Sequence, residues 1–244
     1  MLVSLILNRT IKPQLLTDST LYRPLLDILY PQTCLGCNNM LQTGEKILCT
    51  KCRHDLPLTN HHKTPENDAS KRLSGRVALE KVMSMLIFEK QGIVQQIIHK
   101  LKYDGHQEVG TLLGLWYGEI IKAELKNVDE IIPVPLHKRR LKKRGYNQVM
   151  TFCEALSKAL EVPVNKEILW RNKYSKTQTK KAFFLRTDVN KEIFDVNFSE
   201  RDSGKHFLLV DDVLTSGTTL EQCAKALLKI PTTKISIVTM ALTY

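Results

Sequence analysis

The chain has 244 residues, of which 43% are hydrophobic, and its 36 lysines and arginines against 25 acids give a net charge of +11. This length allows one sizeable core and a small additional module. No apolar run approaches the 18 residues that a membrane-spanning helix needs. The apolar start, 1–7, lacks a preceding basic stretch and a small-residue cleavage site, so we expect no signal peptide and a cytoplasmic protein. The basic excess suits phosphorylated ligands or nucleic acid and is equally consistent with a solvated cationic surface.

Four of the six cysteines form two C-x-x-C pairs, which follow a predicted short helix over 15–30. The pairs are Cys34 and Cys37, then Cys49 and Cys52. Two tight knuckles can close a tetrahedron of thiolates around zinc, and such a site is structural because it leaves no open position. Free cysteines or a redox pair are the alternative, which two adjacent pairs disfavour. We therefore predict an amino-terminal helix and zinc module over 1–60, with His54, His61 and His62 as surface residues rather than ligands.

The rest of the chain alternates apolar, strand-like runs with amphipathic helices. Residues 61–74 are polar and indicate a linker, followed by a main domain over 75–244. In that domain the strands are expected over 82–88, 129–135, 206–210 and 234–242, and the helices over 92–102, 108–125 and 149–160. This order predicts an α/β fold with a mainly parallel, twisted sheet flanked by helices. Cys153 and Cys223 fall on apolar helix faces, where buried free thiols are expected.

The strand over 206–210 leads into the most informative stretch. Asp211 and Asp212 follow it, at the end of the strand where open α/β sheets bind ligands. The turn Thr215–Thr219 comes next, in which glycine permits a left-handed backbone and successive N–H groups can hold an anion. Thr218 and Glu221 are spaced as a capping box for the helix that follows. An ordinary capped helix would explain the turn, but not two carboxylates in front of it, so we predict a phosphate site.

The segment LLVDDVLTSGTT resembles the phosphoribosyl pyrophosphate (PRPP) signature of type I phosphoribosyltransferases. The resemblance implies that Asp211 and Asp212 are the candidate catalytic residues and bind the ribose hydroxyls. It also implies that the turn holds the 5′-phosphate. The implied phosphate-binding residues are Thr215, Ser216, Gly217, Thr218 and Thr219. The competing motif G-x-x-x-x-G-K-[ST] is absent, so a P-loop nucleotidase is not expected.

A cationic run follows the strand over 129–135. Six of the seven residues from Lys138 to Arg144 are cations, which are hard to place on a solvated helix because they repel one another. An anionic partner is therefore expected. A pyrophosphate pocket and a nucleic-acid patch both fit, with Tyr146, Asn147 and Gln148 as neutral donors at the edge.

The block IPVPLHKRRLKKRGYNQ looks like the hallmark of the ComF family of competence-associated, phosphoribosyltransferase-like proteins. That family has a four-cysteine zinc module, a KYxG segment, this block and the VDDVxTxGxT turn, and all four occur here in that order. The resemblance implies magnesium PRPP as the ligand. It adds as PRPP-binding candidates Leu136, His137, Lys138, Arg139, Arg144, Asn147 and Gln148. A hood over 171–186 adds Thr177, Gln178 and Arg186; Val189 stands where the family has asparagine, so Asn190 is left out.

Two functional hypotheses follow. In the first, the protein is an enzyme in which Mg²⁺ and cations such as Lys138, Arg139 or Arg144 hold the leaving pyrophosphate. The acceptor is not identifiable. In the second, suggested by the ComF resemblance, the protein binds single-stranded DNA during uptake or recombination, together with competence proteins. The cationic block with Tyr146 and the basic stretch 171–181 would follow the strand. Both hypotheses use one basic cleft and can coexist.

Overall fold

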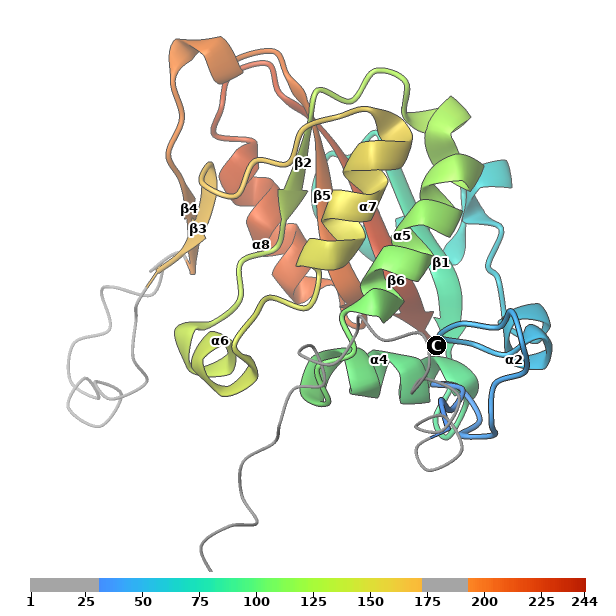
Figure 1. Cartoon of the computed structure of the whole chain (residues 1–244). Helices are drawn as coiled ribbons and strands as arrows, with labels where there is room; N and C mark the ends of the chain where they lie inside the picture. Colours follow the sequence, from blue (N-terminus) through green and yellow to red (C-terminus); the bar gives the residue numbers. More distant parts are fainter. Residues whose placement is uncertain (1–30, 173–192) are drawn as a thin grey trace, which may run out of the picture.

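A four-stranded parallel sheet forms the centre of the computed structural model, which describes residues 31–172 and 193–244. Its strands, in spatial order, are β1 (Lys81–Phe88), β6 (Lys234–Thr243), β5 (His206–Leu214) and β2 (Glu130–Pro133). Every neighbouring pair runs parallel. The carboxyl ends of all four strands therefore meet at one edge, the lower edge in Figure 1. The predicted parallel α/β fold is confirmed.

Helices cover both faces of this sheet (Figure 1). One face packs against α4 (Ile93–Tyr103), α5 (Glu108–Ile121) and α7 (Met150–Leu160). The other packs against α3 (Asp68–Leu73), α8 (Thr218–Leu227) and the hairpin of β3 (Leu169–Arg171) and β4 (Phe194–Val196). Two short helices lie toward the lower edge, α2 (Thr50–His54) in the cysteine module and α6 (Lys138–Arg144) after β2. Short 3-10 helices cover His61–Lys63, Lys122–Leu125 and Glu200–Asp202.

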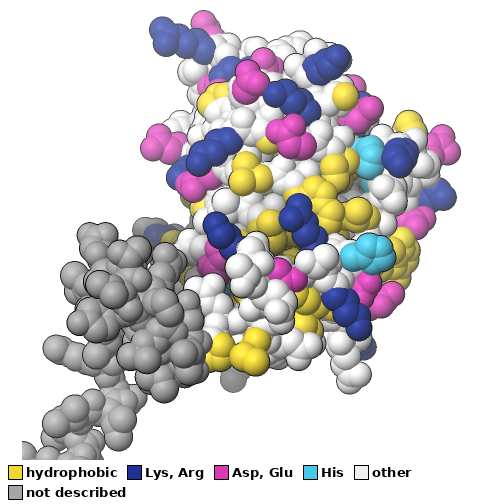
Figure 2. All heavy atoms as spheres, turned by 45° about the vertical axis from the view of Figure 1, so that its right-hand side comes forward, with side chains coloured by type: hydrophobic (Ala, Val, Ile, Leu, Met, Phe, Trp, Pro, Cys, Tyr) yellow, Lys and Arg dark blue, Asp and Glu magenta, His cyan; other side chains and the backbone are white. Residues whose placement is uncertain are grey.

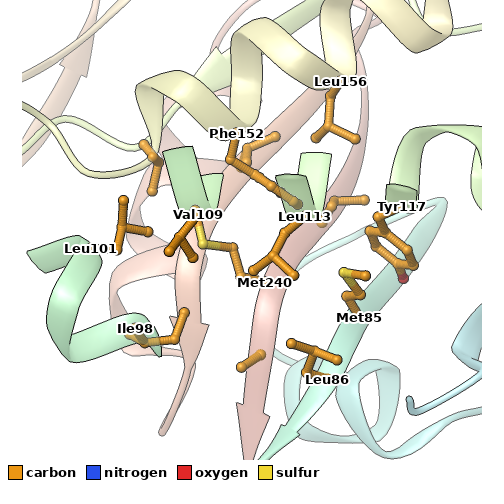
Figure 3. Close-up of a cluster of buried hydrophobic side chains, with 14 of the residues drawn as sticks. Met85, Leu86, Ile98, Leu101, Val109, Leu113, Tyr117, Phe152, Leu156 and Met240 are labelled. Atoms are coloured by element: carbon orange, nitrogen blue, oxygen red, sulfur yellow. The ribbon is translucent and has the colours of Figure 1, made fainter. Parts of the chain in front are cut away.

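The larger of the two hydrophobic clusters joins the sheet to α4, α5 and α7 (Figure 3). Met85 and Met240 project from the sheet toward Leu113 of α5 and Phe152 of α7. Phe152 and Leu113 have no exposed surface, and the cysteine module contributes buried residues to the same cluster. The module therefore shares a core with the sheet.

Helices α5 and α7 approach each other closely because three glycines of α5 face small residues of α7. A Cβ placed on Gly110 would lie 2.2 Å from the Thr151 hydroxyl, and one on Gly118 would lie 2.4 Å from the Ala159 Cβ. On Gly114 it would lie 2.6 Å from the Ala155 Cβ. Real Cβ contacts are not this short. The glycine spacing of four residues thus fixes the distance between the helices and the position of Gln148, just before α7.

The polar segment 61–74, expected to be a linker, is packed against β1. Asn67 caps α3 by accepting from the Ser70 N–H at 3.0 Å, and its amide donates to the Val82 carbonyl of β1 at 2.9 Å. Leu73 is fully buried. His61 is also buried, against the prediction, and its ring accepts from the Ser84 N–H. Polar residues here make specific contacts, so polarity was a poor guide to a linker; the domain boundaries themselves remain a prediction.

The α5–α7 contact yields a test in which the usual effect of a substitution is reversed. Gly→Ala in an exposed helix stabilises by about 1 kcal/mol. We expect Gly114→Ala to destabilise instead, by about 1–3 kcal/mol, because its Cβ meets Ala155 and the Phe152 carbonyl. Thermal unfolding followed by circular dichroism measures this, with exposed Thr111→Ala on the same helix as control. A higher Tm for Gly114→Ala would contradict the close packing.

Candidate functional site at the carboxyl edge of the sheet

The two adjacent aspartates lie within β5 rather than after it. The strand was predicted to end at Val210, but it continues to Leu214, paired with β6 through Leu242. The apolar run ends at Val210, but the ladder hydrogen bonds do not depend on side-chain polarity, so the strand extends beyond the hydrophobic pattern. Asp211 and Asp212 therefore have a rigid backbone.

The carboxylate of Asp212 is buried and holds three sequence motifs together. Its side chain is 10% exposed and lies 2.9 Å from the Lys102 ammonium, and it accepts from the Gln148 amide at 2.5 Å. The Gln148 oxygen accepts from Arg144 at 2.5 Å, and Arg144 also donates to the Tyr103 hydroxyl at 3.3 Å. Since Lys102 and Tyr103 are consecutive at the end of α4, these contacts form a closed ring.

Lys102 and Tyr103 were not among the predicted site residues. The signal for them was the KYxG segment, which was recognised as part of the family pattern but given no role. Arg144 and Gln148 were predicted and are in the ring, whereas Asn147 donates to the Val134 carbonyl at 3.0 Å. Leu136 and His137 are half-buried between β2 and α6.

The Asp211 carboxyl has an unusual ionisation. Burial, and then the adjacent Asp212 carboxylate, raise the pKa of Asp211 to about 8, although Lys102 and Arg140 oppose the shift. A carboxylate that is costly to ionise in the ligand-free protein gains from any ligand hydroxyl that donates to it. Strongly shifted carboxyls of this kind are frequent at functional sites.

The predicted phosphate turn, Thr215–Thr219, joins β5 to α8 and is held from behind by two arginines that the sequence did not indicate. Arg72 of α3 donates to the Thr215 carbonyl at 2.6 Å, and Arg76 donates to the Ser216 carbonyl at 2.7 Å. With these carbonyls bound, the N–H groups of the turn are the ones left for a ligand. Among the described residues, none accepts a hydrogen bond from the N–H of Thr215, Ser216 or Gly217.

The capping box predicted for Thr218 and Glu221 is wrong. Gly217, with a φ of 77°, is the N-cap of α8, and no side chain caps the helix. Glu221 instead pairs with Arg76 and with Lys225. The N-cap position, where a capping hydroxyl would have to be, is occupied by the left-handed glycine of the turn. The first N–H groups of α8 therefore have no capping side chain from the N-cap residue, and they point toward the place where the turn would hold an anion.

The cationic run forms the solvent-exposed helix that mutual repulsion was expected to prevent. The His137 ring caps α6 by accepting from the Arg139 N–H at 3.2 Å, and Gly145 ends the helix in a left-handed conformation. No residue of α6 is buried. Long side chains on a two-turn helix can spread into water, which reduces the repulsion. Within the described residues, no carboxylate forms an ion pair with Lys138, Arg139, Arg140, Lys142 or Lys143.

The hood candidates Thr177, Gln178 and Arg186 lie outside the described residues. In the sequence they fall in 173–192, between the end of β3 and the start of β4. Tyr146, predicted as a neutral donor and a stacking residue, is half-buried, and its hydroxyl donates to the Leu101 carbonyl. Tyr103 is an exposed aromatic residue at this edge. It is 52% exposed, and the centroid of its ring lies 5.0 Å from the Arg144 guanidinium carbon.

The four cysteines of the amino-terminal module form one cluster. The sulfurs of Cys34, Cys37, Cys49 and Cys52 all lie within 4.8 Å of one another, and those of Cys37 and Cys49 are 3.8 Å apart. A tetrahedron with Zn–S bonds of about 2.3 Å has sulfurs about 3.8 Å apart. The Cys34 sulfur accepts from the N–H groups of Gly36 and Cys49 at 3.3 and 3.2 Å. These N–H groups stabilise a thiolate, so the donor set fits structural zinc.

Comparison with known proteins agrees with this arrangement. Residues 25–63 match the double zinc ribbon domain family, and residues 150–242 match the phosphoribosyl transferase domain family. Competence protein ComFC of Bacillus subtilis is 30% identical over 199 residues, covering 81% of this chain and 78% of that protein. The chain belongs to the ComF family. In the described residues, the ribbon holds a single four-cysteine cluster.

Other relatives of this ComF chain include the DNA utilization protein YhgH of Escherichia coli K12, 28% identical over 80% of this chain and 84% of that protein. Competence protein F of Haemophilus influenzae is 26% identical over 84% of this chain and 94% of that protein. A purine phosphoribosyltransferase structure from Pyrococcus horikoshii covers 53% of this chain and 73% of that one, with 18% identity and a TM-score of 0.34. No helix in the described part of the chain has the length and apolarity to cross a membrane.

The cysteine cluster predicts a metal content. We expect one zinc per chain by elemental analysis, and Cys52→Ser should lose the metal and lower the Tm because the buried sulfur completes the tetrahedron. Cys223→Ala removes an equally buried thiol outside the cluster and should retain one zinc. A zinc content unaffected by Cys52→Ser would contradict the site.

The raised pKa of Asp211 predicts a pH-dependent stability difference. Because this pKa lies above its unfolded value, ionised Asp211 destabilises the ligand-free fold. The destabilisation is absent below about pH 4, grows as the pH rises, and is complete above about pH 8. We expect Asp211→Asn to raise the Tm, and the gain to grow between about pH 5.5 and pH 8. Asp55→Asn, at an exposed carboxylate, is the control; a gain independent of pH would count against the raised pKa.

Proposed function

We propose that this ComF-family chain binds magnesium PRPP at the carboxyl edge of the sheet and acts in the use of incoming DNA. The observation that carries the proposal is the Thr215–Thr219 turn. Its carbonyls are held by Arg72 and Arg76 while its N–H groups stay available, and it follows two adjacent carboxylates on one strand. A phosphate next to a diol matches this arrangement of donors and acceptors.

Different groups of the described residues would bind different parts of PRPP. The turn and the first N–H groups of α8 would bind the 5′-phosphate. Asp211 and Asp212 would accept from the ribose hydroxyls, for which Asp212 must exchange Lys102 or Gln148 for the ligand. Lys138, Arg139 and Arg144 lie after β2, on the side where the pyrophosphate would extend. Magnesium bound with PRPP would neutralise part of the pyrophosphate charge.

If the chain is a transferase, its residues favour departure of pyrophosphate mainly through charge. Cations of α6 and Lys102 would stabilise the leaving group, and the ionised aspartates would stabilise positive charge on the ribose ring. The acceptor remains open. Release of pyrophosphate in the presence of candidate acceptors is the direct assay for this step.

Calorimetry with magnesium PRPP tests binding. We expect the Asp211→Asn, Asp212→Asn double variant to lose binding, because each substitution replaces an acceptor oxygen at the diol site with an N–H donor. Arg76→Gln should weaken binding about tenfold or more, because the Ser216 carbonyl loses its partner and the turn loses its orientation. Lys71→Gln, an exposed neighbour on α3, is the matched control. A folded wild type that binds no PRPP would refute the proposal.

A second function, binding of single-stranded DNA, is favoured by α6. Five of its six cations are exposed and form no ion pair with a carboxylate among the described residues, and the exposed Tyr103 lies beside Lys143 and Arg144. Cations with a neighbouring aromatic ring match the backbone and bases of a single strand. The names of the Escherichia and Haemophilus relatives, DNA utilization protein and competence protein, agree with such a partner. The base-stacking role thus moves from Tyr146 to Tyr103.

A salt titration tests this second function. We expect affinity for an oligothymidylate to fall steeply with salt, and Lys142→Glu with Lys143→Glu to reduce both the affinity and the salt slope, the slope by about 1.4 for two lost phosphate contacts. Lys126→Glu with Lys158→Glu makes the same change in charge at exposed positions elsewhere, in the turn after Leu125 and on α7. Equal losses in the two double variants would show only a general effect of net charge.

A further inference from the structure

The four cysteines of the amino-terminal module differ in their access to solvent. Cys34 has no exposed surface and Cys52 is 3% exposed, whereas Cys37 and Cys49 are half-buried. The two half-buried residues come from different C-x-x-C pairs, and their sulfurs lie 3.8 Å apart. Each pair thus contributes one buried cysteine and one that solvent can reach.

A pocket with a volume of about 350 Å³ gives access to this half of the cluster. Cys37 and Cys49 line it, as does the small exposed part of Cys52. Met40, which also lines the pocket, is 64% exposed, so the pocket opens to solvent. Figure 2, turned toward the side on which α2 lies in Figure 1, shows basic and acidic side chains interspersed there. A small uncharged molecule can therefore approach the pocket without electrostatic repulsion.

The hydrogen bonds of the cluster distinguish Cys37 from the other sulfurs. The Cys34 sulfur accepts from the N–H groups of Gly36 and Cys49. The Cys49 sulfur accepts from the Cys52 N–H at 3.4 Å. Among the described residues, no N–H donates to the Cys37 sulfur. Hydrogen bonds to a thiolate stabilise it and reduce its nucleophilicity, so Cys37 combines solvent access with the more reactive sulfur.

We propose that Cys37 and Cys49 form a site of reversible oxidation by hydrogen peroxide, at which a disulfide forms between the two sulfurs and the zinc is released. The Cys37 thiolate attacks one oxygen of the peroxide, the O–O bond breaks, and the second oxygen leaves as hydroxide. The Cys49 thiolate then attacks the sulfenic acid at Cys37, which expels a second hydroxide as the S–S bond forms. Solvent protons convert both hydroxides into water, so the two thiolates lose the two electrons that the peroxide gains.

Oxidation of this pair also affects the rest of the fold. A structural zinc ion needs four ligands, so it dissociates when two of them are oxidised. Cys49 is the N-cap of α2, and the guanidinium carbon of Arg53 in that helix lies 5.3 Å from the centroid of the Trp116 ring of α5. The module also contributes buried residues to the larger hydrophobic cluster. Loss of zinc therefore weakens the junction between the module and α5 and lowers the Tm. None of these residues belongs to the proposed phosphoribosyl site.

Peroxide treatment of the full-length, zinc-loaded protein tests the proposal. The dye 4-(2-pyridylazo)resorcinol reports released zinc, and mass spectrometry of the partly oxidised, alkylated and trypsin-digested protein locates the disulfide. Cys49 is the only cysteine of the peptide Ile47–Lys51, whereas Cys34 and Cys37 share one peptide, and fragmentation between them distinguishes the two. We expect a Cys37–Cys49 disulfide to appear together with the released zinc. Dimedone should trap the sulfenic acid at Cys37, and dithiothreitol with added zinc should restore the metal content.

Both the position of the disulfide and a control variant can contradict the proposal. A first disulfide between Cys34 and Cys37, or between Cys49 and Cys52, would overturn it, as would zinc retained under peroxide. Cys223→Ala removes a buried thiol outside the cluster and should release zinc at the wild-type rate. Slower release from this variant would show that oxidation passes through a thiol outside the module, which would also overturn the proposal.

Discussion

The buried carboxylate of Asp212 determines how the elements at the carboxyl edge of the sheet fit together. A carboxyl group with 10% of its side chain exposed needs hydrogen-bond partners that replace the water it has lost. Lys102, at the end of α4, and Gln148, just before α7, meet this need. Arg144 and Tyr103 then close the ring. A ribose bound there as proposed would have to replace one of the contacts of Asp212, so ligand affinity and the stability of the free protein would be opposed.

The phosphate turn depends on a different part of the chain. The Thr215 carbonyl accepts from Arg72 of α3, and the Ser216 carbonyl accepts from Arg76, which lies between α3 and β1. The Leu73 side chain, also from α3, packs against the turn so closely that a Cβ placed on Gly217 would lie 2.7 Å from it. The turn is therefore shaped by a segment some 140 residues earlier in the sequence. These contacts orient the carbonyls of a hydroxyl-rich, exposed turn.

Helix α5 connects these features to the zinc module. On its inner side, glycines set the close approach of α7 and so the position of Gln148 beside Asp212. On its outer side, Trp116 receives Arg53 from the module. Zinc bound by the four cysteines would hold α2 through Cys49 and Cys52 and would thereby support the contact of Arg53 with α5.

The sequence by itself determined the parallel α/β fold, the four-cysteine cluster and the position of the glycine turn after Asp212, because each depends on local patterns: apolar periodicity, C-x-x-C spacing, and a glycine among hydroxyls. Phosphate binding by that turn stays a prediction. It could not show that β5 continues through Asp211 and Asp212, since ladder hydrogen bonds leave no mark on side-chain type. Nor could it assign roles to Lys102, Arg72 and Arg76. Their partners lie more than 100 residues away, and a lysine or arginine in a polar segment reads the same whether it faces water or a buried acceptor. Only the tertiary structure decided those contacts, because burial of an acceptor is a property of the packed molecule.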